Sequence, residues 1–308
     1  MRSARVKPAQ ALRAGDRIRL VAPASPFPRD QFRAGLEQVR RMGFDPIWDP
    51  VEHSRTGFLA GSDASRAARL QRALVEPESQ AVWSIRGGYG TARLLRLLDL
   101  DACRRRAKPL IGFSDITALL VNLARPGGLV GIHGPVITQL GLLPKSNRRW
   151  LGRLLRGAAG GDRLPLGRLR MLVPGRAEGR LLGGNLAVLT SLVGTAYMPD
   201  LRGAILFIEE VGESAYRLDR LWGQLAMSGA LDGVAGVVLG QLTRCEPAGR
   251  SRWSARTVLE RAVASLGRPA VSGAAFGHGS RNAALPVGSR ARLDADRRSL
   301  RLLDQPVE

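Results

Sequence analysis

The chain has 308 residues, of which 44% are hydrophobic and 24% charged, so it is long enough for two domains and too apolar to be disordered throughout. Its two cysteines, Cys103 and Cys245, exclude a disulfide scaffold and a zinc module built on four thiolates, and neither lies in a context that points to a nucleophile. Lys and Arg number 47 against 26 Asp and Glu, which gives a net charge of +21 carried almost wholly by arginine.

The first half of the chain alternates short apolar runs with amphipathic stretches. We predict strands at 18–22, 46–48, 81–85 and 109–113, and helices at 30–42, 63–74, 91–98 and 115–124. Strands that alternate with helices are typical of α/β proteins built on a doubly wound parallel sheet. We therefore assign an N-terminal α/β domain with such a sheet to residues 1–150.

Between 157 and 175 glycine, proline and arginine predominate and no periodicity is visible. We assign a linker to 151–175 and a C-terminal mixed α/β domain to 176–308. In that domain strands are predicted at 179–184, 204–208, 236–240, 269–272 and 290–293, and helices at 186–193, 217–228 and 257–266.

Ser114 stands where a predicted strand runs directly into a predicted helix. A hydroxyl there lies at the carboxyl end of a parallel strand, where open α/β sheets place their ligands, and beside the free N–H groups of a helix N-terminus. The segment is similar to the nucleophile elbow of hydrolases, although Ile116 occupies the place of the second glycine of G-x-S-x-G. Serine is also a preferred helix N-cap, so the segment alone leaves both roles open.

The glycine-rich turn at 86–90 reads Arg-Gly-Gly-Tyr-Gly. It lacks the Lys-Ser/Thr of a P-loop and the spacing of the dinucleotide fingerprint. Its glycines would let backbone N–H groups approach a ligand closely, so the turn fits better as a second source of oxyanion donors beside Ser114. An ordinary tight turn is the alternative.

Carboxylates and a histidine in the second domain could complete a catalytic triad. Glu209, Glu210 and Glu213 follow an apolar strand, and one of them could orient a histidine. The sequence does not say which one acts, and solvated charges at a strand end are the alternative. His278 is flanked by glycines that leave its imidazole uncrowded, although a lone loop histidine is more often structural. The order Ser, Glu, His is that of the α/β-hydrolases.

The other two histidines lack such a context. His133 lies at the end of a short apolar segment and is predicted to be a satisfied core or hinge histidine. His53 lies in a loop without an acidic or hydroxyl motif around it.

The arginines are scattered through every segment, and aromatic residues make up only 5% of the chain. We interpret the basicity as mainly a solvated arginine-rich surface, with a non-catalytic nucleic-acid-binding protein as the alternative from another class. No run approaches the ~20 apolar residues that span a bilayer, and no signal-peptide core follows the N-terminus. We expect a cytoplasmic protein with reduced thiols and no membrane or nucleic-acid partner.

Six segments together resemble the LD-carboxypeptidase family of serine peptidases, which includes muramoyltetrapeptide carboxypeptidases and microcin-immunity peptidases. The resemblance spans nearly the whole chain, and the shared order of the segments makes it specific. They are Val-Ala-Pro at 21–23, the turn at 86–90, Ile-Gly-Phe-Ser-Asp at 111–115, Gly-Gly-Asn-Leu at 183–186, Phe-Ile-Glu-Glu at 207–210 with Tyr-Arg at 216–217, and Gly-His at 277–278.

The resemblance implies a class I amidotransferase-like N-terminal domain, a mixed C-terminal domain, a Ser–His–Glu triad at their junction, and a homodimer. It makes Ser114 the nucleophile, His278 the general base and Glu209 the acid. The family usually has Glu-Asp after this strand, and here Glu210 fills the aspartate position. The oxyanion donors would be the backbone N–H groups of Gly88 and Asp115.

The implied reaction is hydrolysis of the amide before a terminal D-amino acid, without metal or cofactor. Its substrate would be a muropeptide tetrapeptide that loses D-Ala, as in peptidoglycan recycling, with Arg86 and Tyr89 as substrate-binding residues. The alternative is a microcin-immunity-type hydrolase of peptide–nucleotide conjugates. Immunity-type members often carry a tryptophan that stacks on the leaving group near the position of Met198, so the methionine favours the muropeptide.

Overall fold

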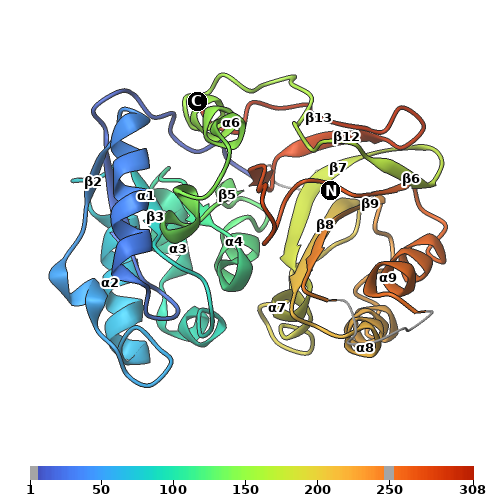
Figure 1. Cartoon of the computed structure of the whole chain (residues 1–308), viewed down its shortest axis with the longest axis horizontal. Helices are drawn as coiled ribbons and strands as arrows, with labels where there is room; N and C mark the ends of the chain where they lie inside the picture. Colours follow the sequence, from blue (N-terminus) through green and yellow to red (C-terminus); the bar gives the residue numbers. More distant parts are fainter. Residues whose placement is uncertain (1–5, 246–252) are drawn as a thin grey trace.

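The computed structural model describes residues 6–245 and 253–308, which form two α/β parts side by side, each built around one sheet (Figure 1). In the first sheet all neighbours are parallel except the edge strand β11, which runs antiparallel to β5. Its order is β11 (Leu285–Val287), β5 (Gly131–His133), β4 (Leu110–Gly112), β3 (Ala81–Ser84), β1 (Arg17–Val21) and β2 (Asp45–Ile47).

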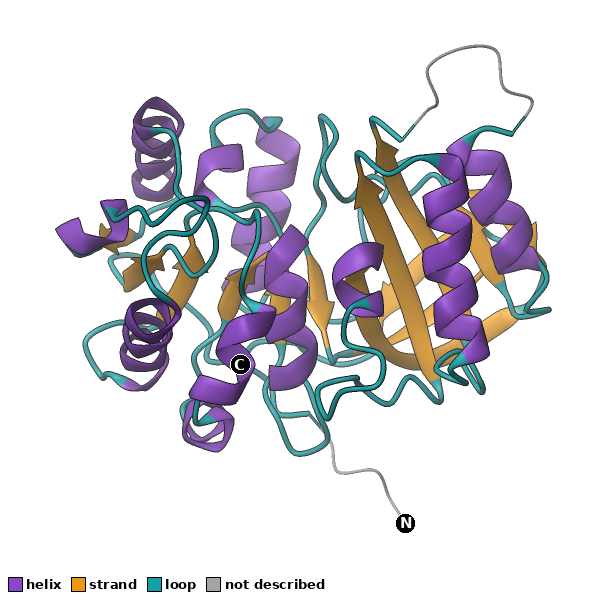
Figure 2. Ribbon diagram, turned by 90° about the horizontal axis from the view of Figure 1, so that it is seen from below, coloured by secondary structure: helices purple, strands orange, loops and turns teal. Residues whose placement is uncertain are grey.

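Helices lie on both faces of the first sheet (Figure 2). Strands covered on both faces are apolar along their whole length, and every residue of β3 and β4 is buried. The predicted doubly wound parallel sheet is confirmed. The helices are α1 (Arg29–Arg41), α2 (Asp63–Val75), α3 (Leu100–Arg105), α4 (Thr117–Leu123), α5 (Ile137–Leu140) and α6 (Lys145–Leu155), with 3₁₀ helices η1 (Pro50–His53), η2 (Ala92–Leu97) and η3 (Ser114–Ile116).

The second sheet is mixed, as predicted, and α7 (Leu186–Thr190), α8 (Ala215–Met227) and α9 (Ala255–Ala264) lie along one side of it (Figure 1). Strands β7 to β10 are parallel neighbours, whereas β12, β13 and β6 pair antiparallel. The order is β13 (Ser299–Leu302), β12 (Arg290–Asp294), β7 (Arg176–Asn185), β8 (Ala204–Val211), β9 (Gly236–Thr243), β10 (Ala270–Ser272) and β6 (Arg170–Val173).

The structure differs from the predicted elements where segments are short or pair over long distances. Residues 151–155 of the predicted linker end α6, and residues 170–173 form β6, which gains regular structure by pairing with β10. The helix predicted at 91–98 is the 3₁₀ helix η2. Strand β11, assigned by sequence to the second domain, belongs to the first sheet. None of the described helices is long and apolar enough to cross a membrane.

Strand β11 connects the two parts of the molecule in a way that matters for function. Leu285 pairs with His133 at the edge of the first sheet, and Trp150 of α6 donates its indole N–H to the carbonyl oxygen of Ala284 at 2.9 Å. The loop between β10 and β11 leaves the second sheet and is anchored on the first. This loop carries His278.

Candidate active site

Ser114 lies at the carboxyl end of β4, where the strand passes into η3 and α4. Its φ of +64° is a left-handed value that strains a residue with a Cβ. This conformation is the one a nucleophile elbow uses to expose its side chain on a strand-to-helix turn. A Cβ at Gly87 would lie 3.0 Å from the Cβ and 3.2 Å from the Oγ of Ser114, so glycine lets the loop at 86–90 pass against the serine.

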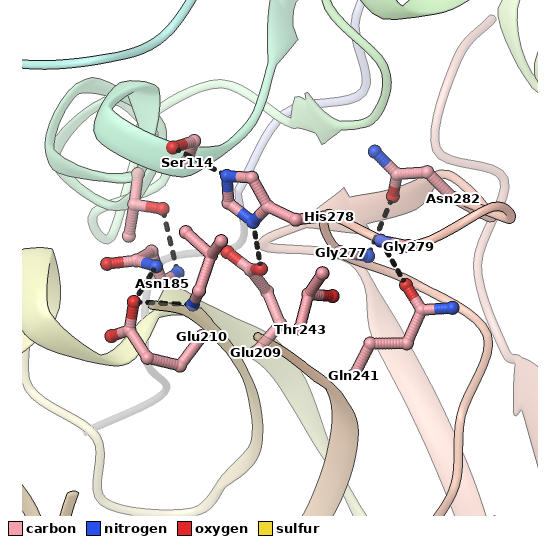
Figure 3. A network of polar contacts seen from close by, with 12 residues as sticks. Ser114, Asn185, Glu209, Glu210, Gln241, Thr243, Gly277, His278, Gly279 and Asn282 are labelled. Atoms are coloured by element: carbon pink, nitrogen blue, oxygen red, sulfur yellow. Dashed lines mark hydrogen bonds and ion pairs between the residues drawn. The ribbon is translucent and has the colours of Figure 1, made fainter. Parts of the chain in front are cut away.

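The loop that carries the predicted histidine is held by side chains from both parts. Gln139 of α5 donates from Nε2 to the carbonyl oxygen of Gly277 at 3.4 Å and accepts from Nδ2 of Asn282 at 2.9 Å. Asn282 accepts the N–H of Gly277 at 3.1 Å, and Gln241 of β9 accepts the N–H of Gly279 at 2.8 Å. The backbone on both sides of the imidazole is therefore fixed (Figure 3).

The imidazole of His278 lies between the serine and a glutamate, 164 and 69 residues away in sequence (Figure 3). Its Nδ1 lies 2.6 Å from Oε2 of Glu209, and its Nε2 lies 3.0 Å from Oγ of Ser114. An ionised carboxylate only accepts, so Nδ1 carries the proton and Nε2 accepts from the hydroxyl. The three predicted side chains thus meet in the order that a Ser–His–acid relay requires.

The geometry distinguishes the three neighbouring glutamates. Glu209 is fully buried, and its Oε2 bonds His278 while its Oε1 has no hydrogen-bond partner among the described residues. Glu210 points to the other side of β8, where it accepts from Nδ2 of Asn185 and from the backbone N–H groups of Ala187 and Val211 at 2.7–2.8 Å. Glu213 pairs with an arginine four residues on.

Glu210 belongs to a second polar chain that joins the two parts of the molecule. Asn185, at the end of β7, donates its backbone N–H to Oγ1 of Thr117 at 3.0 Å and its amide group to Glu210. Thr117 begins α4, the helix that follows the serine. A Cβ at Gly184 would lie 2.3 Å from Oγ1 of Thr117, so a glycine allows this close approach. Burial raises the pKa of Glu210, and its three donors oppose that rise.

At Gly277 a single added methyl group would disturb the contact between His278 and Glu209. Its φ is +116°, and a Cβ there would lie 2.8 Å from Oε2 of Glu209. We expect Gly277→Ala to displace the carboxylate and to lower kcat about 10²-fold, since a misplacement of ~1 Å costs that much. The matched control is Gly267→Ala, which also has a positive φ of 62° but no atom within 4 Å of the added methyl group. Equal kcat values in steady-state assays of the two variants would contradict this account.

The predicted oxyanion donors flank the serine. Asp115 follows it in η3, and Gly88, with a φ of +111°, belongs to the loop that passes against it. In the part of the chain that the structure describes, neither backbone N–H has an acceptor. The carboxylate of Asp115 is buried, which raises its pKa, and it accepts the N–H of Thr91 at 2.8 Å.

The two predicted substrate-binding residues lie in the same loop and face solvent. Arg86 is exposed and donates from Nη1 to the carbonyl oxygen of Pro26 at 2.6 Å. Tyr89 is 53% exposed, and its ring lies 5.5 Å from that of Phe58, which is 63% exposed. A cation and two aromatic rings are therefore accessible on or next to the loop that passes against the serine. Met198 is half-buried and packs against the hydrophobic core.

His133 differs from the satisfied histidine that the sequence predicted. It is fully buried, but neither ring nitrogen has a hydrogen-bond partner among the described residues. Its ring lies edge-on to Phe113, Phe207 and Phe276, and Phe113 also contacts His278 at 4.7 Å between ring centroids. The phenylalanine side chains around the imidazole carry no nitrogen or oxygen atom with which a ring nitrogen could form a hydrogen bond. Burial lowers the pKa of His133 to about 4, so the ring is neutral.

The neutral ring of His133 makes stability depend on pH. The unfolded chain takes up a proton at this residue below its ordinary pKa of 6.5, whereas the folded chain does so only near 4, so stability falls as pH falls through this window. From pH 7 to pH 5 we expect the residue to lower the free energy of unfolding by about 2 kcal/mol. Urea unfolding at both pH values should show a smaller decrease in His133→Leu. An equal decrease in both proteins would contradict the buried neutral state.

The remaining candidates lie away from catalysis. Burial raises the pKa of Cys103 to about 11 and also raises that of Cys245, so both thiols are protonated and poor nucleophiles. His53 packs against the rings of Phe27 and Phe32. No group of three or more metal-ligating side chains occurs within 6–245 and 253–308.

Comparisons with known proteins agree with this geometry. The model of the LD-carboxypeptidase N-terminal domain matches residues 18–134, and that of the C-terminal domain matches residues 178–293. The murein tetrapeptide carboxypeptidase of Pseudomonas aeruginosa is 37% identical over 91% of this chain and 94% of its own length. The microcin C7 self-immunity protein of Escherichia coli is 27% identical over 92% of this chain and 91% of its own length.

A solved structure extends the likeness to the fold. The muramoyltetrapeptide carboxypeptidase from Oxalobacter formigenes superposes with a TM-score of 0.82 at 28% identity, over 94% of this chain and all of the other. Both halves of the chain therefore match one family in sequence, and the whole chain matches it in fold. The chain belongs to the LD-carboxypeptidase family.

Proposed function

We propose that this family member is a serine LD-carboxypeptidase that removes D-Ala from muropeptide tetrapeptide. The observation that carries the proposal is the Ser114–His278–Glu209 relay, with 3.0 Å and 2.6 Å between the bonded atoms. The relay supplies a nucleophile, a base and a carboxylate in hydrogen-bond contact, which is the minimum that acyl transfer to serine requires.

In the proposed reaction, Ser114 Oγ attacks the carbonyl carbon before the terminal D-amino acid while Nε2 of His278 takes the hydroxyl proton. The C–N bond then breaks, and Nε2 returns this proton to the leaving amine. Water then attacks the carbonyl carbon of the acyl-enzyme and gives a proton to Nε2. As the bond between this carbon and Oγ of Ser114 breaks, Nε2 passes the proton to Oγ. Glu209 keeps Nδ1 protonated and stabilises the imidazolium, and burial of the carboxylate strengthens this attraction.

The negative charge that develops on the carbonyl oxygen would be held by the N–H groups of Gly88 and Asp115. Both groups lie beside Ser114 and are free to donate. Removal of one such donor typically lowers kcat by ~10²–10³-fold. The proposed route uses only side chains and backbone groups, and so it needs no metal or cofactor.

Substrate capture is assigned to Arg86 and Tyr89. A muropeptide carries several carboxylates, and the exposed guanidinium of Arg86 can form bidentate bonds with one of them. The exposed ring of Tyr89 offers an apolar surface next to the same loop. The net charge of +21 would further attract an acidic peptide.

Two other functions are alternatives, and each predicts a different experimental result. A microcin-immunity-type hydrolase would cleave peptide–nucleotide conjugates, but the relative named for murein tetrapeptide is more similar to this chain in sequence, at 37% identity, than the self-immunity protein is, at 27%. A basic nucleic-acid-binding protein would use the charge and not the relay. It would shift DNA in a salt-sensitive way, and Ser114→Ala would leave that binding unchanged.

The test is to incubate the protein with muropeptide tetrapeptide, a peptide–nucleotide conjugate and a plain L,L-peptide, and to identify the products by mass spectrometry. We expect loss of D-Ala from the tetrapeptide, with no change in rate when EDTA is added. Preferential cleavage of the conjugate would favour the immunity-type function, and inhibition by EDTA would indicate a metal mechanism. Sedimentation of the same sample tests the homodimer that the family resemblance implies.

A further inference from the structure

Two loops meet beside the serine, one after β1 at residues 22–26 and one after β3 at residues 86–90. The N–H of Ser25 donates to the carbonyl oxygen of Gly87 at 3.3 Å, and its Oγ accepts the N–H of Tyr89 at 3.2 Å. The second loop is thus bonded to the first on both sides of Gly88, whose own N–H has no acceptor among the described residues. The position of that N–H depends on what holds these two loops.

Arg66 of α2 contacts both loops from within the protein. Its side chain is fully buried, and Nη1 donates to the carbonyl oxygens of Pro23 and Gly90, the latter at 3.1 Å, while Nη2 pairs with Asp63. Burial of a guanidinium is costly unless hydrogen bonds and a counter-charge compensate for lost hydration. The buried guanidinium therefore stabilises the arrangement in which the carbonyl oxygens of Pro23 and Gly90 both accept its hydrogen bonds.

The same peptide group is held from its other side by Asp115. The carbonyl oxygen of Gly90 and the N–H of Thr91 belong to one peptide group, and the N–H donates to Oδ2 of Asp115 at 2.8 Å. The hydroxyl of Thr91 also donates to the backbone carbonyl oxygen of Asp115. A cation on the carbonyl end and an anion on the N–H end match the direction of the peptide dipole, so the two charges reinforce each other.

The backbone and its close neighbours favour glycine at 90. Gly90 has a φ of +116°, and a Cβ there would lie 2.7 Å from Cδ2 of Leu59 and 3.0 Å and 3.1 Å from Nη1 and Nη2 of Arg66. Arg69, one turn further along α2, does not share this contact. It pairs instead with Glu52 and donates to the carbonyl oxygen of Ala60.

We propose that Arg66 is a positioning residue for the oxyanion hole. With the carboxylate of Asp115 it clamps the Gly90–Thr91 peptide group, and so it fixes the N–H of Gly88 relative to the N–H of Asp115. This inference rests on the proposed function, which assigns these two N–H groups to the oxyanion. It predicts an effect on the transition state, because the substrate's ground-state carbonyl oxygen gains less from the two donors than the oxyanion does.

The test is Arg66→Ala, assayed for D-Ala release from tetrapeptide with and without millimolar guanidinium chloride. We expect kcat to fall about 10²-fold while KM changes little, because the donors act mainly in the transition state. Guanidinium ion should enter the vacated space and raise kcat about tenfold by restoring charged donors, whereas sodium chloride should not. Arg72→Ala is the control, because this arginine of α2 is exposed and, among the residues that the structure describes, its side chain pairs only with Asp49. It should keep wild-type kcat and show no rescue.

Further measurements separate the possible outcomes. If Arg66→Ala fails to fold, Arg66→Lys keeps the charge with a different donor geometry and should lower kcat with an unchanged KM. A lower melting temperature with kcat unchanged per folded molecule, or a lower kcat that guanidinium does not raise, would overturn the positioning role. The rate of Ser114 labelling by a fluorophosphonate is measured in parallel. Labelling of wild-type protein without D-Ala release would refute the proposed substrate, and slower labelling in Arg66→Ala would still support the clamp.

Discussion

Replacement of Ser114 by alanine is expected to lower D-Ala release from tetrapeptide by about 10⁶-fold, because removal of a serine nucleophile has an effect of this order. The change deletes one oxygen whose bond within the described residues goes to Nε2 of His278. The backbone N–H groups proposed to hold the oxyanion are unaffected. Product formation is measured by mass spectrometry over long incubations, so that a residual rate can be quantified.

The fold should tolerate this substitution. Alanine has the same Cβ as serine, so the strain at a φ of +64° is unchanged, and Ser114 makes no cap bond to its own helix. The free energy of unfolding should therefore change by about 1 kcal/mol or less, the usual contribution of one hydrogen bond. Ser228→Ala is the control, since this exposed residue follows α8 and its hydroxyl donates to the carbonyl oxygen of Leu225 at 3.0 Å. Undiminished D-Ala release by Ser114→Ala would exclude this serine as the nucleophile.

Much of the first sheet could be predicted because its strands are apolar along their length and alternate with amphipathic helices. β1, β3 and β4 lie within one residue of the predicted bounds, and the turn after β3 and the serine after β4 lie at the carboxyl ends of their strands. The proximity of Ser114, Glu209 and His278 was implied by family resemblance. Neither spacing nor periodicity could have placed residues so distant in sequence in contact.

Two of the strands that escaped prediction, β11 and β6, depend on partners far away in the chain. β11 has three residues, and its partner β5 lies about 150 positions earlier, so no local pattern marks either its existence or its sheet. β6 has the same difficulty, because its residues look irregular until β10 pairs with them. The predicted linker and domain bounds did not anticipate these two long-range pairings. Gln139 and Asn282, which hold the histidine loop, were missed because single amides carry no recognisable pattern.

The arginine-rich composition was interpreted as a solvated surface, and the structure shows a second use. Many arginines are exposed and form ion pairs at the surface, as Arg72 and Arg202 do. Arg66 and Arg69 are buried, however, and donate to backbone carbonyl oxygens. A guanidinium group has five donors in a fixed plane, which suits it to joining several loops at once. Composition alone cannot distinguish these two uses.

Glu209→Gln should lower kcat about 10⁴-fold, the effect of the corresponding acid-to-amide change in a Ser–His–acid relay. The amide is nearly isosteric, but it removes the negative charge that stabilises the imidazolium. Its NH₂ group can also face Nδ1 and favour the tautomer in which Nε2 carries the proton, and such an imidazole cannot accept from Ser114. The adjacent residue provides the matched comparison. Glu210 lies on the opposite side of β8 and makes no bond to His278.

Glu210→Gln is expected to act on stability. Its two carboxylate oxygens accept from Asn185, Ala187 and Val211, and an amide has only one accepting oxygen, so at least one buried donor loses its partner at a cost of about 1–3 kcal/mol. Its kcat should fall about tenfold or less, through loosening of the contact between Asn185 and Thr117. Urea unfolding and steady-state kinetics on both variants separate the two roles. The reverse pattern, with kcat lost in Glu210→Gln and retained in Glu209→Gln, would move the catalytic acid by one position along β8.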